Sequence, residues 1–127
     1  MDPLTVSSGA PTATIVSLDG EFDLADRARL EDLLVVAASS PTVVMNFEKT
    51  KYVDSSILQC IVALRKVLEE REAQLVVVGL HDGVSRLFEV CQFGQIFDIR
   101  QSVEDAIATD FGSANLRQLT LLGAGRD

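Results

Sequence analysis

The chain has 127 residues, the length of one ordinary domain of ~100–150 residues, so a two-domain enzyme is not expected. Hydrophobic residues make up 47% of the chain and charged residues 24%, values of a globular protein rather than of a disordered one. Lysine and arginine total 11 against 19 acidic residues, which gives a net charge of -8. Because this charge repels phosphate backbones and anionic lipids, we expect no nucleic-acid partner.

The cysteines and the N-terminus favour a cytoplasmic protein. Cys60 and Cys91 lie far apart, without the spacing of a zinc site or of a redox pair, so we expect both to be small core side chains rather than thiol sensors. Residues 1–4 contain no basic region followed by an apolar stretch, and no window approaches the ~20 apolar residues of a membrane span. We therefore expect no membrane insertion, and we expect neither a cofactor nor a metal.

The first half of the chain alternates between strand and helix patterns. Residues 13–18 are a β-rich run closed by the turn signal Asp19-Gly20, and residues 4–7 are a candidate partner strand in an N-terminal hairpin. Apolar residues at helical spacing predict an amphipathic helix over residues 24–38. Residues 42–47 are almost continuously apolar, which is typical of a parallel strand covered on both faces, and a polar turn is expected at residues 48–51.

The second half continues this alternation. The strongest helical period lies in residues 55–71, where Ile57, Ile61, Leu64 and Leu68 fall on one face. Further elements are expected as a strand at residues 74–79, a short helix at 84–91, a strand at 96–99 and a helix that starts at the capping-box-like Ser102-x-x-Asp105.

The element order β-β-α-β-α-β-α-β-α predicts a single α/β domain, with a mixed, mostly parallel β-sheet and crossover helices. The N-terminal hairpin would add an antiparallel edge to this sheet. We expect the domain to cover residues 1–111. Residues 112–127 would then form a C-terminal tail, either a loosely docked short helix or a frayed end.

Two hydroxyls stand immediately before the long helix, in Asp54-Ser55-Ser56. The simpler interpretation is that Asp54 or Ser55 caps the helix, which contributes ~1 kcal/mol but accounts for one residue of the three. An exposed seryl hydroxyl at a helix N-terminus is also a good phosphorylation site, because the N–H groups and the helix dipole stabilise the incoming dianion. Composition and spacing leave both interpretations open.

Residues 12–108 resemble the STAS domain, and specifically the bacterial anti-sigma factor antagonists. Gly20-Glu21-Phe22-Asp23-Leu24 is similar to the family's Gly-Glu-Leu-Asp segment, and residues 43–47 are similar to its strand that ends in Asp or Asn plus a hydrophobic residue. Asp54-Ser55-Ser56 matches its Asp-Ser-Ser or Asp-Ser-Thr phosphorylation motif. Residues 84–88 and 93–97 resemble its third helix and the turn into its last strand.

The resemblance implies a role for each residue of the motif. Ser55 would be phosphorylated by an anti-sigma factor that is also a serine kinase of the histidine-kinase-like ATPase type, and a phosphatase would remove the phosphate. Ser56 is its neighbour, Asp54 is the helix-start anchor, and Asp23 would contact the kinase at the same rim. Ile57 stands where the family usually has Gly, and its bulk is expected at the docking surface. These five residues are therefore the expected partner-binding set.

In the scheme that the resemblance implies, the unphosphorylated protein captures an anti-sigma factor and frees a sigma factor to activate transcription. Phosphorylation at Ser55 reverses this binding. The main alternative is a STAS module of another kind, either a stressosome scaffold or an accessory subunit of a lipid-transport ATPase.

The residues themselves give little support for an enzyme. A phosphoacceptor receiver domain needs clustered acids at strand ends, where this chain has Asn46 and Gly79. A serine hydrolase needs a base, but His81 is the only histidine and no Gly-x-Ser-x-Gly elbow occurs. We expect His81 to be a solvent-facing turn residue.

Overall fold

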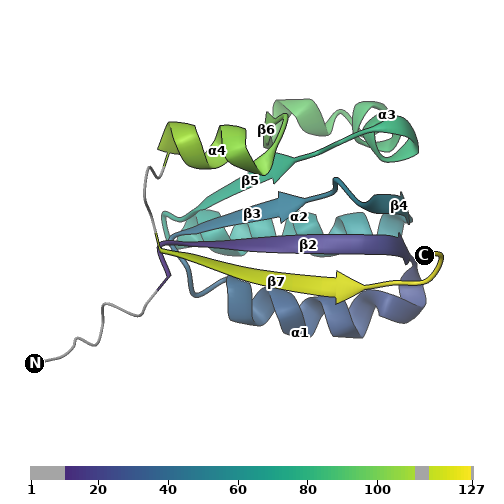
Figure 1. Ribbon diagram of the computed structural model, residues 1–127, viewed down its shortest axis with the longest axis horizontal. Coiled ribbons are helices and arrows are strands. Elements are labelled where there is room, and N and C mark those ends of the chain that lie inside the picture. The colour runs from purple at the N-terminus through teal and green to yellow at the C-terminus, as the bar shows by residue number, and fades with distance from the viewer. Residues whose placement is uncertain (1–10, 111–114, 127) are drawn as a thin grey trace, which may run out of the picture.

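The computed structural model describes residues 11–110 and 115–126 and arranges them as a layered α/β structure (Figure 1). The elements in chain order are β2 (Ala13–Phe22), the 3₁₀ turn η1 (Leu24–Asp26), α1 (Arg27–Ala37), β3 (Thr42–Asn46), β4 (Thr50–Val53), α2 (Ser55–Glu70), β5 (Gln74–Val78), α3 (Asp82–Val90), the 3₁₀ turn η2 (Phe93–Gln95), β6 (Asp98–Arg100), α4 (Val103–Asp110) and β7 (Leu116–Leu122).

The six described strands form one sheet, and every ladder between them is parallel. Strand β2 is central. β7 pairs with its residues 13–19, while β3 pairs with residues 14–17 and β4 with residues 20–22. β5 and β6 continue the sheet beyond β3. The predicted α/β class with a mostly parallel sheet and crossover helices is confirmed.

The helices cover the two faces of the sheet unequally. Alternate strand residues such as Val43 and Met45 face α1, α2 and α3 in the larger core, while Val44 faces α4 in the smaller one. In Figure 1, α4 lies on one side of the strands and α1 and α2 lie on the other. The helical period predicted for residues 55–71 is confirmed, because Ile57, Ile61, Leu64 and Leu68 are all buried.

The polar turn expected at residues 48–51 is only half as long as predicted, since β4 begins at Thr50. The Thr50 side chain is fully buried, and its hydroxyl donates to the Leu18 carbonyl at 2.6 Å. Pairing with β2 therefore satisfies the polar residues that made this segment look like a turn. β4 is the strand that leads directly into α2.

The C-terminal segment is also different from the prediction. Residues 116–122 are neither a short helix nor a frayed tail, because they form β7 along the whole of residues 13–19 of β2. Arg117 anchors this strand by donating to the Val36 carbonyl at 2.8 Å and to the Thr14 hydroxyl at 3.1 Å. β7 thus occupies the place expected for an antiparallel edge. The candidate strand at residues 4–7 lies outside the described residues.

Two smaller expectations have definite outcomes. The last predicted strand is shifted, since β6 covers Asp98–Arg100 while Phe93–Gln95 forms a 3₁₀ turn. The predicted start of α4 is confirmed, because the Asp105 amide donates to the Ser102 hydroxyl at 3.1 Å. Over the described ranges, no helix is long and apolar enough to cross a membrane.

Candidate functional site

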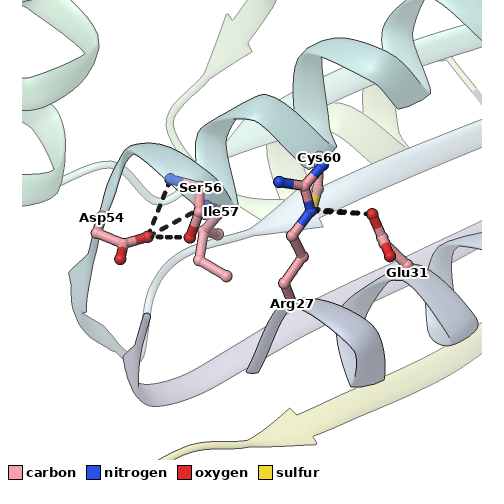
Figure 2. A network of polar contacts seen from close by, with 6 residues as sticks. All are labelled: Arg27, Glu31, Asp54, Ser56, Ile57 and Cys60. Atoms are coloured by element: carbon pink, nitrogen blue, oxygen red, sulfur yellow. Dashed lines mark hydrogen bonds and ion pairs between the residues drawn. The ribbon is translucent and has the colours of Figure 1, made fainter. Parts of the chain in front are cut away.

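Asp54 is placed between β4 and α2 and caps the helix. One carboxylate oxygen, Oδ1, accepts from the Ser56 and Ile57 amides at 3.0 and 3.2 Å (Figure 2). The same oxygen accepts from the Ser56 hydroxyl at 2.5 Å. This hydroxyl is the main cause that lowers the pKa of the Asp54 carboxyl, and the backbone amides lower it further. The predicted role of Asp54 as helix-start anchor therefore has the geometry that it requires.

Asp54 also connects α2 to the segment that follows β2. Its second oxygen, Oδ2, accepts from the Leu24 amide at 3.1 Å. Its own amide donates to the Phe22 carbonyl at 3.3 Å. Asp54 therefore holds the N-terminus of α2 against the turn that carries Asp23, and the two motifs identified in the sequence lie together.

The two serines of the motif differ in exposure and in bonding. Ser56 is half-buried, and its hydroxyl is held by Asp54. Ser55 is exposed, and its hydroxyl makes no hydrogen bond to any residue in the described ranges. The Ser55 hydroxyl is therefore exposed to solvent, whereas the Ser56 hydroxyl is bonded to the capping carboxylate of Asp54.

Ile57 does not lie at the surface. Its side chain is fully buried, at 0% exposure, in the core beneath α1 and α2. The expectation that Ile57 contributes bulk to the docking surface is therefore wrong. The reason is the helical period, which turns this position of the first turn of α2 toward the sheet.

Asp23 follows β2 and lies next to the start of α2, to which the Leu24–Asp54 hydrogen bond joins its segment. We call the surface formed by Asp23, Leu24 and residues 52–55 the rim. The Asp23 side chain itself caps the 3₁₀ turn η1. Its Oδ1 accepts from the Ala25 amide at 2.9 Å, and its amide donates to Asp26 at 2.9 Å. Asp26 also binds Arg29 at 2.7 Å. The Asp23 amide, and after it the Arg29 guanidinium, hold the pKa of Asp26 below its usual range. The rim thus carries two exposed polar side chains, the Asp23 carboxylate and the Ser55 hydroxyl, on segments that the Leu24–Asp54 hydrogen bond joins.

The structure adds rim residues that sequence reasoning missed. Leu24 and Tyr52 are 65% and 53% exposed, which is high for large apolar side chains. A cleft of about 440 Å³ runs between the start of α2 and α3, and it is lined by Lys51, Tyr52, Val53, Asp54, Ser55, Gly83, Val84 and Leu87. Leu24 was expected to begin the helix over residues 24–38, but it lies in η1, ahead of α1. The approach of α3 to β4 depends on the tertiary fold and leaves no local signal.

His81 is not simply a solvent-facing turn residue. It is half-buried at the start of α3, with Nδ1 at 2.9 Å from Asp82 and Nε2 at 3.2 Å from the Phe47 carbonyl. Both partners are acceptors, and only the protonated ring donates from both nitrogens. The hydrogen bond to Asp82 is accordingly the main cause that raises the pKa of His81.

The cysteines have different environments. Cys60 is a buried core residue, as predicted, and burial raises the pKa of its thiol. Its sulfur lies 4.0 Å from Glu31, which in turn binds Arg27 at 3.0 Å (Figure 2). Cys91 is exposed at the C-terminal end of α3, so the prediction of a core side chain is wrong there. The described part of the chain contains no cluster of three or more His, Cys, Asp or Glu residues placed to hold a metal.

A match to the STAS domain family covers residues 5–106. The chain belongs to the STAS domain family. An anti-sigma-B factor antagonist of Staphylococcus aureus strain NCTC 8325 is 28% identical over 91 residues, 70% of this chain and 84% of the relative. The corresponding antagonist of Listeria monocytogenes is 31% identical over 83 residues, 64% of this chain and 73% of the relative.

Solved structures show the same fold. The anti-sigma factor antagonist SpoIIAA in its unphosphorylated form superimposes on this STAS domain with a TM-score of 0.66 and 22% identity, covering 81% of this chain and 94% of that chain. The phosphorylated form of SpoIIAA from Bacillus gives a TM-score of 0.63 and 18% identity, covering 79% and 92%. The curated relatives are thus anti-sigma-B factor antagonists, and the solved structures show that this chain has the fold of SpoIIAA.

Proposed function

We propose that this STAS domain is a cytoplasmic anti-sigma factor antagonist whose partner binding is switched by phosphorylation of Ser55. When Ser55 is unmodified, the rim around it binds an anti-sigma factor, and a sigma factor is released to activate transcription. The observation that supports this most strongly is that the two serines of the motif differ in exposure and in hydrogen bonding. The Ser55 hydroxyl is exposed, while the Ser56 hydroxyl is held by Asp54 at 2.5 Å.

The partner is then also a serine kinase of the histidine-kinase-like ATPase type. In the transfer, the Ser55 oxygen bonds to the γ-phosphorus of ATP while the bond from that phosphorus to the β-phosphate oxygen breaks. The hydroxyl proton passes to a base of the kinase, and ADP leaves. The STAS domain supplies the acceptor, and a phosphatase that hydrolyses the phosphoserine restores the binding-competent form.

Phosphorylation weakens the complex through charge and desolvation. The rim combines exposed apolar side chains, Leu24 and Tyr52, with the exposed carboxylate of Asp23. A phosphate adds roughly -1.5 to -2 of charge to this rim. An interface that accepts a neutral hydroxyl has to desolvate that charge or pair it, and the neighbouring carboxylate adds repulsion.

The test uses four baits in the native cell lysate: the unmodified protein, Ser55→Ala, Ser55→Asp and Ser56→Ala. We expect the unmodified protein, Ser55→Ala and Ser56→Ala to retain an ATP-binding protein that Ser55→Asp loses. Incubation of that partner with ATP should then place one phosphate on Ser55, located by mass spectrometry, and none on Ser55→Ala. Equal capture by all four baits, or a phosphate on Ser56, would contradict the proposal.

A further inference from the structure

The end of the chain is packed against the end of β2 that leads into the rim. We call residues 123–126 the C-terminal strap. The Glu21 amide donates to the Ala124 carbonyl at 2.7 Å, and the Ala124 amide returns a bond to the Glu21 carbonyl at 3.2 Å. Glu21 is two residues before Asp23. The strap is therefore attached to the segment that carries one of the rim carboxylates.

The strap packs so closely against the end of β2 that two positions of this contact, Gly123 and Gly20, have no space for a side chain. A Cβ at Gly123 would lie 2.4 Å from the Glu21 carbonyl oxygen and 2.8 Å from the Phe22 ring. Gly20 has a φ of +117°, and a Cβ there would lie 2.6 Å from the Ala124 oxygen. Such contacts occur where two backbones approach directly. The strap therefore packs in a defined position against the end of β2, and it can be displaced from this position.

Lys51 connects this strap to the cleft that contains Ser55. Its ammonium donates to the Gly125 carbonyl, and its side chain is exposed. Within the described ranges Lys51 makes no ion pair, whereas Arg27 and Arg29 each bind a neighbouring carboxylate. Lys51 is also the one cation among the residues that line the 440 Å³ cleft together with Ser55. Lys51 therefore lines the cleft of the phosphate acceptor while its ammonium is bound at the strap.

We propose that Lys51 is a phosphate-responsive latch, which holds the C-terminal strap when Ser55 is unmodified and moves to the phosphate when Ser55 is phosphorylated. The proposal rests on the proposed function in that it takes Ser55 as the phosphorylation site. Its chemistry is a competition between two acceptors for one ammonium. A phosphate dianion offers three oxygens and a charge opposite to that of the ammonium, whereas the Gly125 carbonyl offers one neutral oxygen.

Two carboxylates bear on this exchange, and that of Glu21 lies against Gly125, next to the present acceptor of Lys51. Asp54 is the carboxylate of the same cleft, and its oxygens already accept amide and hydroxyl hydrogens. It repels the phosphate rather than competing for it. The flexible stem of an exposed lysine allows the ammonium to move between two acceptors. Phosphorylation then breaks the hydrogen bond from Lys51 to the Gly125 carbonyl, and the strap stays attached through the backbone hydrogen bonds between Ala124 and Glu21.

The experiment incorporates phosphoserine at position 55 during translation, so it requires no kinase and no partner. It is made in the unmodified background and in the variants Lys51→Met, Lys51→Arg and Lys49→Met. Lys49 is an exposed lysine in the turn before β4 and serves as the control. ³¹P NMR follows the second ionisation of the phosphate, and amide hydrogen exchange follows Glu21 and Ala124. Failure of the partner-binding experiments leaves these two readouts intact.

We expect the second pKa of the phosphate to be about one unit lower in the unmodified background, in Lys51→Arg and in Lys49→Met than in Lys51→Met, which lacks the positive charge at position 51. We also expect phosphorylation to raise exchange at Ala124 roughly fivefold in the unmodified and Lys49→Met backgrounds, with little effect in Lys51→Met, where the hydrogen bond to Gly125 is already lost. A phosphate pKa that is the same with and without Lys51 would overturn the proposal. Strap exchange that does not respond to the phosphate would overturn it as well.

Discussion

Asp54 is the residue on which the geometry of the site depends. Its carboxylate receives the first amides of α2 with one oxygen and the Leu24 amide with the other. Because it satisfies donors from two segments, we expect Asp54→Ala to lower the free energy of unfolding by about 1–2 kcal/mol. Asp32→Ala, at an exposed acid of α1, serves as the control. Denaturant unfolding that shows the same loss in both variants would contradict this account.

The pKa of Asp54 adds a pH signature to this variant. A lowered carboxyl pKa gives stability that is present above the unfolded value near 3.9 and is lost as the pH falls through the folded pKa. The stability difference between the unmodified protein and Asp54→Ala should therefore shrink below about pH 4. This places the ionised carboxylate, rather than the side-chain shape, at the origin of the cap.

His81 gives the opposite dependence on pH. Its raised pKa gives stability that is fully present below the unfolded value near 6.5 and is lost as the pH rises through the folded pKa. We expect the unmodified protein to lose stability relative to His81→Gln between about pH 6 and 8. Chemical unfolding at a series of pH values measures this, and parallel curves for the two proteins would show that the His81 contacts with Asp82 and Phe47 contribute nothing.

At the scale of the element, α2 separates the core from the site along a single helix. Leu64 is 5% exposed and packs in the larger core, while Ser55 is exposed at the first position. We expect Leu64→Ala to cost ~2–5 kcal/mol, because it leaves a cavity, and Ser55→Ala to stay within about 1–2 kcal/mol of the unmodified protein. The reverse order in denaturant melts would show that core and site are wrongly assigned.

The space around two glycines, Gly123 in the strap and Gly83 in α3, predicts different effects of substitution by alanine. A Cβ at Gly123 would meet the Glu21 backbone at 2.4 Å, while nothing lies within 4 Å of a Cβ at Gly83 in α3. We expect Gly123→Ala to destabilise by about 1–3 kcal/mol through overpacking. Gly83→Ala should be neutral or stabilising by about 0.5–1 kcal/mol, as alanine is favoured in a helix. Equal thermal midpoints for the two variants would contradict the close seating of the strap.

The elements were easier to predict than their pairing. The helix α2 follows from the apolar period of its segment, and the buried strands β3 and β5 follow from their continuous apolar runs. β4 was missed because Thr50 and Lys51, the first two of its four residues, are polar and resemble part of a turn until the strand pairs with β2. β7 was missed because the leucines of this segment fit a helix as well as a strand. Only the pairing of Ala13 with Leu116, about a hundred residues away, decides between these two structures.

At the scale of the whole molecule, the site was predicted in outline and not in detail. The resemblance to the STAS domain implied that Asp23, Asp54 and Ser55 lie at one rim, and the pairing of β2 with β4 brings the segments that carry them together. Which serine is exposed depends on side-chain bonding that the string Asp-Ser-Ser does not encode. The burial of Ile57 and the return of the C-terminal strap to the rim are tertiary effects of the same kind.

The central claim is that the rim around Ser55 binds a partner only while Ser55 is unmodified. The most direct measurement is the dissociation constant of the ATP-binding partner for two proteins, one unmodified and one with phosphoserine incorporated at position 55. We predict that the phosphate weakens binding at least about tenfold, which corresponds to roughly 1.4 kcal/mol. Equal dissociation constants for the two proteins would contradict the claim.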